Sequence, residues 1–151
     1  MTTKSSKHLA IFTPPFIDLI LEGKKTIESR FSKVRCAPFG VVKEGDIVIM
    51  KQSGGLVIGE FTVARVVTFN NLDKGLLEKI AKEYGKELCA DADENFWERR
   101  KDSRYATFLY VSNLIRYEKP FPFPKKDRRG WVIIENSTIG KQKKLFEEES
   151  D

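Results

Sequence analysis

The sequence predicts an α+β domain in which a small mixed or antiparallel β-barrel of about five to six strands is decorated by about three helices. The prediction depends on two observations. Apolar, β-branched runs cluster in residues 47–69 and 105–135, and helical patterns lie before and between them, so the order of strands and helices is mixed. The 151 residues are about one domain in length, and no internal repeat or second domain is evident.

The N-terminal part of the chain is predicted to place one helix between two strands. Residues 1–7 are small, polar and basic, so we expect a flexible segment there. The apolar run at 8–12 predicts a strand. Thr13 is expected to cap a helix that starts at the two following prolines and ends at Gly23 in the left-handed conformation. A second strand is predicted over 25–31.

The middle of the chain carries the strongest β pattern. Residues 47–50 are too apolar for a half-solvated strand, and 56–69 are the longest run of β-forming residues. The Ser-Gly-Gly sequence at 53–55 predicts a hairpin turn between them. Gly59 lies inside the longer run, which predicts a bulge or bend of the kind that barrels need at their corners.

The C-terminal half is predicted to contribute two helices and two strands. An apolar stripe over 71–84 predicts a helix closed by Gly85. The acidic residues 91–94 predict the first turn of a short third helix that carries Phe96 and Trp97. The remaining predictions are strands at 105–117 and 131–135, an extended proline-rich loop at 121–124, a domain spanning 8–135 and a polar tail at 136–151.

Composition excludes several classes of protein. No apolar run approaches 18 residues, and the basic N-terminus is not followed by the apolar h-region of a signal peptide, so we predict neither a membrane span nor a secretory signal. Two cysteines, Cys36 and Cys89, and one histidine exclude a four-ligand Cys/His zinc site and argue against a disulfide scaffold. His8 is expected to be a hydrogen-bonded residue at the start of a strand. We therefore expect a reduced, cytoplasmic protein without metal ion or cofactor.

Positive charge is concentrated in two segments. Residues 1–40 carry seven Lys/Arg and three Asp/Glu, and residues 99–130 carry ten and three, whereas residues 71–98 carry four and eight. If the fold brings the basic segments together, they form a cationic face suited to phosphate-bearing partners. An ordinary solvated surface is an equally good interpretation of a net charge of +5.

The densest set of chemically useful residues follows Gly23, where a helix passes directly into a strand. Alternation places Thr26, Glu28 and Arg30 on one face of that strand, and Lys25 lies at the turn, from which it can swing toward Glu28. An amine, a carboxylate and a planar guanidinium together suit a phosphate and the edge of a base. The alternative is a structural ion pair between Glu28 and Arg30.

Three stretches of the chain resemble the ASCH domain, a branch of the PUA-like superfamily. They are Gly-x-Lys-Thr-x-Glu-x-Arg at 23–30, Gly-Asp at 45–46 before a buried strand, and Val-Ile-Gly-Glu-Phe-x-Val at 57–63. The resemblance is good over residues 9–69. It implies a small barrel with helices around it, a cleft between the first helix and the barrel, and RNA or a nucleotide-like ligand as the partner.

The resemblance also implies which residues form the site. It places Lys25, Glu28 and Arg30 along the cleft with Thr26 beside them. Some small bacterial members are similar to amidohydrolases that remove an acyl group from the exocyclic amine of modified cytidine, using the lysine and a threonine of a Lys-Thr-x-Thr stretch; other members have been described as ribonucleases. Glu28 replaces that second threonine here. A small hydrolase acting on a modified nucleoside or RNA, with Lys25 and Glu28 as catalytic residues, is therefore the alternative to a binding domain.

Three further segments have both a functional and a structural interpretation. Ser53 and Gly54 suit a backbone nest for an anion, although a plain hairpin turn explains them without a ligand. The segment 96–104 mixes aromatic and Arg residues that suit nucleic acid, but its aromatic residues are more simply interpreted as core anchors. The most basic turn is expected either to contact backbone phosphates or to be solvated; its candidate residues are Lys125, Lys126, Arg128 and Arg129.

Overall fold

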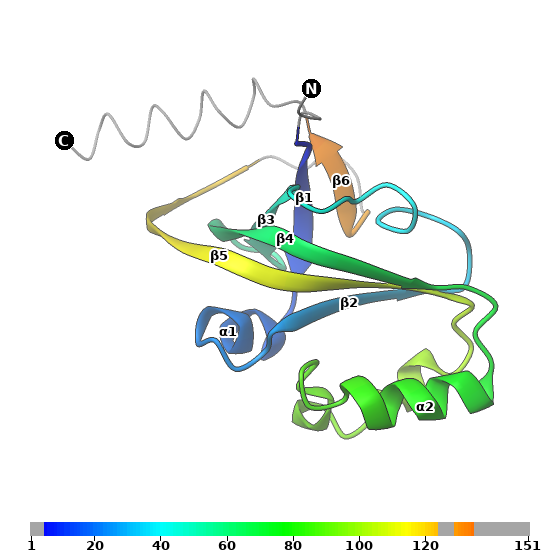
Figure 1. The fold of residues 1–151 in the computed structure, drawn as a ribbon. Coiled ribbons are helices and arrows are strands. Elements are labelled where there is room, and N and C mark those ends of the chain that lie inside the picture. The colour runs from blue at the N-terminus through cyan, green and yellow to red at the C-terminus, as the bar shows by residue number, and fades with distance from the viewer. Residues whose placement is uncertain (1–4, 124–128, 135–151) are drawn as a thin grey trace.

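Six strands form one curled, barrel-like sheet that two α-helices accompany in the computed structural model, which describes residues 5–123 and 129–134 (Figure 1). The predicted α+β class and its barrel-like sheet are confirmed. The strand order across the sheet is β2-β5-β4-β3-β1-β6. The elements are β1 (Lys7–Phe12), α1 (Phe16–Leu21), β2 (Ile27–Ser32), β3 (Ile47–Gln52), β4 (Val57–Phe69), α2 (Lys74–Tyr84), the 3-10 turns η1 (Ala90–Ala92) and η2 (Glu98–Arg100), β5 (Tyr105–Phe121) and β6 (Trp131–Ile134).

The sheet is mixed, as predicted, and β4 and β5 form its antiparallel centre. β1 pairs in parallel with β3 and antiparallel with β6, and β2 forms an edge through its antiparallel pairing with β5. The pairing register of β4 and β5 shifts between Val57 and Gly59, which confirms the predicted bulge. A Cβ at Gly59 would lie 2.6 Å from the main-chain oxygen of Ile115, so this crossing requires glycine.

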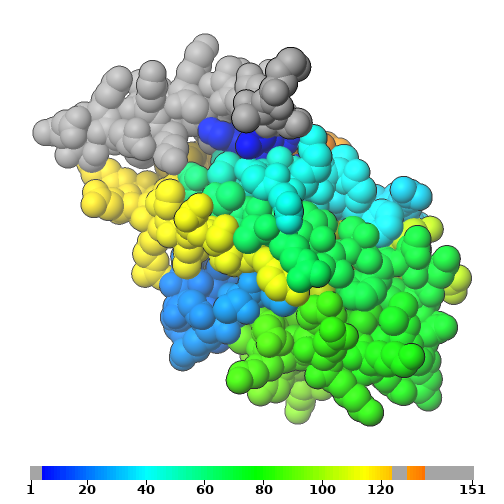
Figure 2. Space-filling model, in the orientation of Figure 1, coloured from blue at the N-terminus to red at the C-terminus, as the bar shows by residue number. Residues whose placement is uncertain are grey.

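Strand β2 and helix α1 contribute to different apolar clusters. Ile27 and Phe31 of β2 pack with the cluster that includes Phe96 and Phe108, whereas Ile17 and Ile20 of α1 pack with another. Figure 2 shows the surface of α1 and the start of β2 (blue) lying against the segment that follows α2 (yellow-green), and the N–H groups of Thr26 and Ile27 donate to the main-chain oxygen of Glu87 in that segment. Glu28 and Arg30 belong to neither cluster and pair with each other, as the predicted alternation along β2 requires.

The structure corrects two predictions about the helices. The third helix expected after residues 91–94 is replaced by two 3-10 turns, so the described chain has two α-helices. Asp93 adopts extended dihedral angles immediately after η1, and this interrupts any continuous helix. Thr13 does not cap α1 with its side chain; its main-chain oxygen accepts hydrogen bonds from the backbone N–H groups of Phe16 and Ile17 instead.

The strand ends also differ from the predictions. β5 continues four residues beyond 117 to Phe121, because Phe121 pairs with Val57 and packs into a third apolar cluster. α2 begins at Lys74, where Asp73 accepts a hydrogen bond from the Leu76 N–H. The left-handed stop at Gly23 is confirmed by its φ of 79°. The predicted polar tail at 136–151 and residues 1–4 lie outside the described residues. Within the described part, no helix has the length and apolar character needed to cross a membrane.

Candidate functional site

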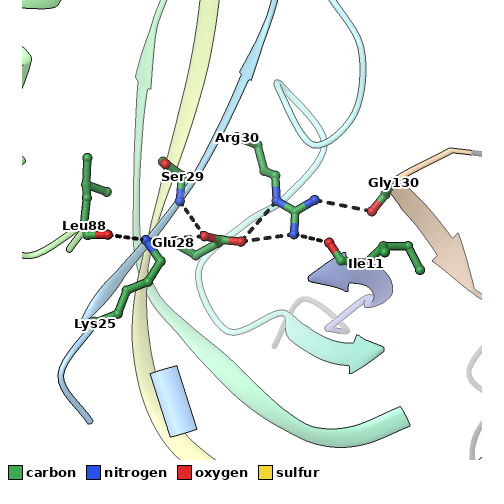
Figure 3. Close-up of polar contacts among 7 residues, drawn as sticks. All are labelled: Ile11, Lys25, Glu28, Ser29, Arg30, Leu88 and Gly130. Carbon is green, nitrogen blue, oxygen red and sulfur yellow. Dashed lines mark hydrogen bonds and ion pairs between the residues drawn. The ribbon is translucent and has the colours of Figure 1, made fainter. Parts of the chain in front are cut away.

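Lys25 is buried at the point where the α1 turn enters β2. Its side chain reaches this position because the N–H groups of Lys24 and Lys25 both donate to the main-chain oxygen of Leu19. The residue is 2% exposed, and its Nζ donates to the main-chain oxygen of Leu88 at 2.8 Å (Figure 3). Nζ also lies 3.6 Å from Glu28 Oε1. The predicted approach of Lys25 to Glu28 therefore occurs.

Burial changes the acid–base properties of this amine. Desolvation lowers the pKa of Lys25, and the neighbouring Glu28 carboxylate offsets only part of that effect. The Lys25 amine therefore releases its proton more readily than a solvated lysine does. A lowered pKa favours the neutral amine that a general base needs.

Glu28 and Arg30 form a bidentate ion pair on the polar face of β2. Glu28 Oε2 accepts from Arg30 Nε at 3.2 Å and from Nη2 at 3.0 Å, and Oε1 accepts from the Ser29 N–H at 3.0 Å. Arg30 Nη2 also donates to the main-chain oxygen of Ile11 at 2.8 Å, which links β2 to β1. Glu28 and Arg30 therefore form the structural ion pair that was one of the two interpretations of the sequence.

The Arg30 guanidinium still has one lightly engaged edge. Its carbon lies 4.8 Å from the Phe12 ring centre and 5.2 Å from that of Trp131, so two aromatic residues hold it in place. Among the described residues, Nη1 makes only a long 3.5 Å contact, to the main-chain oxygen of Gly130. This edge retains hydrogen-bonding capacity for a ligand.

A pocket of about 400 Å³ lies beside this cluster, and we call it the β2 pocket. Its described lining contains four cationic side chains but only one carboxylate, together with four phenylalanine rings. The charged residues are Lys25, Glu28, Arg30, Arg99 and Arg100, and the rings are Phe12, Phe16, Phe31 and Phe96. The pocket therefore combines a net positive charge with aromatic surface.

Two of these cations, Arg99 and Arg100, were not among the candidate site residues predicted from the sequence. The Arg100 guanidinium carbon lies 3.6 Å from the Phe96 ring centre, and Nη1 donates to the Phe96 main-chain oxygen at 2.9 Å. Desolvation lowers the pKa of Arg100, although Glu28 and Asp93 act in the opposite direction. The only sequence signal was the mixture of Arg and aromatic residues at 96–104. Phe96 is a core anchor, as expected, but its burial also positions the arginines.

Three other candidates lie away from the β2 pocket. The Thr26 side chain is exposed and does not line the pocket, while its N–H donates to the main-chain oxygen of Glu87. Ser53 and Gly54 are exposed in the turn after β3, where Gly54 has a φ of 68°, and neither lines the pocket. The structure does not bring these three residues together with Lys25 in the β2 pocket. Their contacts with a ligand therefore remain predictions.

The basic turn is only partly described. Lys125, Lys126 and Arg128 lie outside the described residues, whereas Arg129 is described and exposed. Arg129 precedes Gly130, whose main-chain oxygen accepts from the Ile11 N–H at 3.0 Å and lies near Arg30. The predicted phosphate contacts of this turn therefore stay predictions.

Neither the histidine nor the cysteines assemble a metal-binding cluster in the part of the chain that the structure describes. No group of three or more His, Cys, Asp or Glu residues is placed there to hold a metal ion. Cys36 and Cys89 are free thiols, the first exposed and the second partly buried. His8 is buried and hydrogen-bonded, as expected, and it lies outside the β2 pocket.

The curled mixed sheet, with α1 beside a charged pocket on its edge strand, is consistent with the small PUA-like fold that the sequence predicted. The model of the ASCH domain family matches residues 11–121, and the chain belongs to this family. No curated protein matches the chain.

Solved structures show how widely this fold is shared. The chain is similar to ASCH from Zymomonas mobilis, with a TM-score of 0.71 and 16% identity over 93% of this chain and 95% of that chain. It is also similar to the N-terminal domain of Staphylothermus marinus McrB, with a TM-score of 0.57 and 13% identity over 91% and 93% of the two chains. A hypothetical protein from Leishmania major gives a TM-score of 0.57 and 13% identity over 98% of each chain. At these identities the likeness concerns the fold alone.

Proposed function

We propose that the β2 pocket binds RNA or a nucleotide-like ligand through a phosphate group and a base. The observation that carries this proposal is the excess of cationic over anionic side chains in a pocket that also offers aromatic rings. Its volume of about 400 Å³ falls in the range of small-molecule sites. The ASCH family is in general RNA-binding-like, which agrees with this chemistry.

Each charged residue has a distinct part in this proposal. Arg99 is two-thirds exposed at the pocket and supplies a phosphate contact. Arg100 lies between the Phe96 and Phe31 rings, and its planar guanidinium N–H groups are suited to a phosphate or to the edge of a base. Arg30 offers Nη1 to a phosphate or a base edge. Glu28 holds Arg30 in place and balances the charge of Lys25.

Binding of fluorescently labelled single-stranded RNA, with unlabelled 5′-mononucleotides as competitors, tests the proposal. Arg99→Ala is expected to weaken binding and to reduce the salt slope by about 0.7, the value for one lost contact with a single strand. Arg104→Ala is the matched control, because Arg104 is exposed nearby and does not line the pocket. The absence of any RNA or nucleotide binding, or equal losses in both variants, would contradict the proposal.

A small hydrolase acting on an acylated nucleoside is the second candidate, and the buried Lys25 favours it. The lowered pKa makes Lys25 a suitable base to take a proton from water in the pocket. The water oxygen would attack the acyl carbon, the C–N bond to the exocyclic amine would break, and the amine would take up a proton. The products would be a cytidine and a carboxylic acid.

A panel of N4-acylated cytidines decides between binding alone and hydrolysis. Lys25→Ala is expected to abolish turnover, and Lys24→Ala, which changes an exposed neighbour, is expected to retain it. Ligand affinity measured with the same proteins separates loss of binding from loss of chemistry. If the wild-type protein releases no acid from any member of the panel, the hydrolase is excluded and the binding proposal is unaffected.

A further inference from the structure

A second, smaller cavity lies on the other side of Arg30 and Phe31, and we call it the Thr107 cavity. Its volume is about 180 Å³, and its walls include the aromatic residues Phe39 and Trp131. Arg30 and Phe31 line both this cavity and the β2 pocket, so the two hollows are neighbours that share a wall.

The hydroxyl of Thr107 is the unusual feature of this cavity. Thr107 is 1% exposed, and among the described residues its Oγ1 has no hydrogen-bond partner. A buried polar group without a hydrogen-bond partner destabilises the folded state. Valine has the same shape and would avoid this cost, so the hydroxyl indicates that a polar group enters the cavity.

The strand register places this hydroxyl close to the Arg30 guanidinium. Thr107 of β5 pairs directly with Arg30 of β2, and paired residues on antiparallel strands project from the same face of the sheet. The cavity therefore offers a hydroxyl, which both donates and accepts, beside a planar cation and between aromatic walls. These groups match the edge and the faces of a nucleobase.

We propose that the Thr107 cavity receives a second nucleobase, so that the ligand of this protein is an oligonucleotide of at least two nucleotides rather than a mononucleotide. This inference rests on the proposed function of the β2 pocket. One nucleotide occupies the β2 pocket, the connecting phosphate lies at the lightly engaged Nη1 edge of Arg30, and the next base enters the Thr107 cavity. The cavity is too small for a whole nucleotide but suits a planar ring.

Affinities for nucleotides of one and two residues test the proposal. The probes are 5′-phosphorylated homodinucleotides of the four bases and the matching 5′-mononucleotides. For at least one base, the dinucleotide is expected to bind about tenfold more tightly than the mononucleotide, the gain typical of one stacked base. Thr107→Val is expected to reduce this advantage by about three- to tenfold, as for one lost hydrogen bond. Thr68→Val is the matched control, because Thr68 pairs with Thr107 from β4 and is exposed.

Alkylation of Cys36 provides a second readout that does not require a variant. Cys36 is exposed and lines the Thr107 cavity, whereas Cys89 lines neither hollow and serves as the internal reference. The preferred dinucleotide is expected to slow iodoacetamide labelling of Cys36 in proportion to occupancy, with the matching mononucleotide giving much weaker protection.

The outcomes separate this inference from the proposed function. Mononucleotide binding without a dinucleotide advantage and without protection of Cys36 would overturn the second subsite and leave the β2 pocket as proposed. The second subsite would also be overturned if Thr107→Val and Thr68→Val changed the affinity advantage of the dinucleotide equally. The Thr107 hydroxyl would then bind only a water molecule and not the base. A failure of every nucleotide and RNA probe to bind would overturn both proposals.

Discussion

Two buried polar clusters occupy different parts of this sheet and differ in what surrounds them. In the first, which we call the His8 cluster, Trp131 Nε1 donates to His8 Nδ1 at 3.0 Å, and His8 Nε2 lies 2.9 Å from Asp46 Oδ2. Because Nδ1 is the acceptor, Nε2 carries the proton and donates to Asp46. The N–H groups of Ser6 and Lys43 also donate to this carboxylate. Neither His8 nor Asp46 lines either of the two described cavities.

The second cluster, Lys25–Glu28–Arg30, is also buried but lies against the β2 pocket. Its members bond to one another and to the main chain, yet Arg30 Nη1 is left with only a long contact among the described residues. The comparison indicates that a buried charge is not itself a sign of function. The His8 and Asp46 side chains join chain segments and reach neither described cavity, whereas the Lys25 cluster joins segments and also presents donors to the β2 pocket.

Breaking the His8 cluster should produce the largest loss of stability. Asp46→Ala removes the common acceptor of three donors and leaves the buried His8 Nε2–H without a partner, so we expect the free energy of unfolding to fall by about 3 kcal/mol. Urea denaturation at neutral pH measures this, with Asp102→Ala as an exposed control. RNA affinity of the folded variant should match that of wild type. A stable variant with weakened binding would show that the two clusters are coupled.

The acid dependence of stability should report on the same carboxylate. Burial by itself raises the pKa of Asp46, but the hydrogen bonds from His8, Ser6 and Lys43 outweigh it and lower the pKa overall. The contribution of Asp46 is therefore complete above its unfolded pKa of about 3.9 and is lost as pH falls through the lower folded-state pKa. Asp46→Asn should remove this part of the acid dependence, which urea titrations at a series of acidic pH values would detect.

The same contrast shows what the sequence could and could not predict. The left-handed stop at Gly23 and the alternation along β2 are local properties, so they correctly placed Glu28 and Arg30 on one face beside Lys25. The hydrogen bonding of His8 was also expected, but its partners Asp46 and Trp131 lie 38 and 123 positions away. Partners at such separations depend on the strand order and cannot be found from periodicity.

The residues missed at the candidate site have the same explanation. Arg100 reaches the β2 pocket because two 3-10 turns replace the expected helix and bring Phe96 against Phe31. Thr107 lies beside Arg30 only through the register of β2 with β5. Local patterns predict which residues share one strand face, whereas the composition of a pocket depends on which distant strands become neighbours.

Removing the carboxylate of the second cluster should have an intermediate effect on stability. Glu28→Gln retains the shape but leaves Lys25 and Arg30 without their shared counter-ion, so we expect the free energy of unfolding to fall by about 2 kcal/mol. The matched control is Glu22→Gln, which breaks the exposed pair with Lys24 and should cost less than about 1 kcal/mol. Equal effects in urea denaturation would contradict the view that the Glu28 interactions depend on burial.

Replacing the buried amine should have the smallest effect on stability and should separate the two clusters most clearly. Desolvation dominates the lowered pKa of Lys25, so Lys25→Met, which leaves Glu28 paired with Arg30, should change the free energy of unfolding by less than about 1 kcal/mol or even raise it. Because the unfolded chain binds more protons at this site, wild-type stability should rise relative to Lys25→Met as pH increases through the lowered folded-state pKa, and should level off above about 10.4. RNA affinity should fall about tenfold through loss of a charged donor in the β2 pocket, with the exposed Lys24→Met as control. A large loss of stability with unchanged affinity would instead make the Lys25 cluster a second structural network like that of His8.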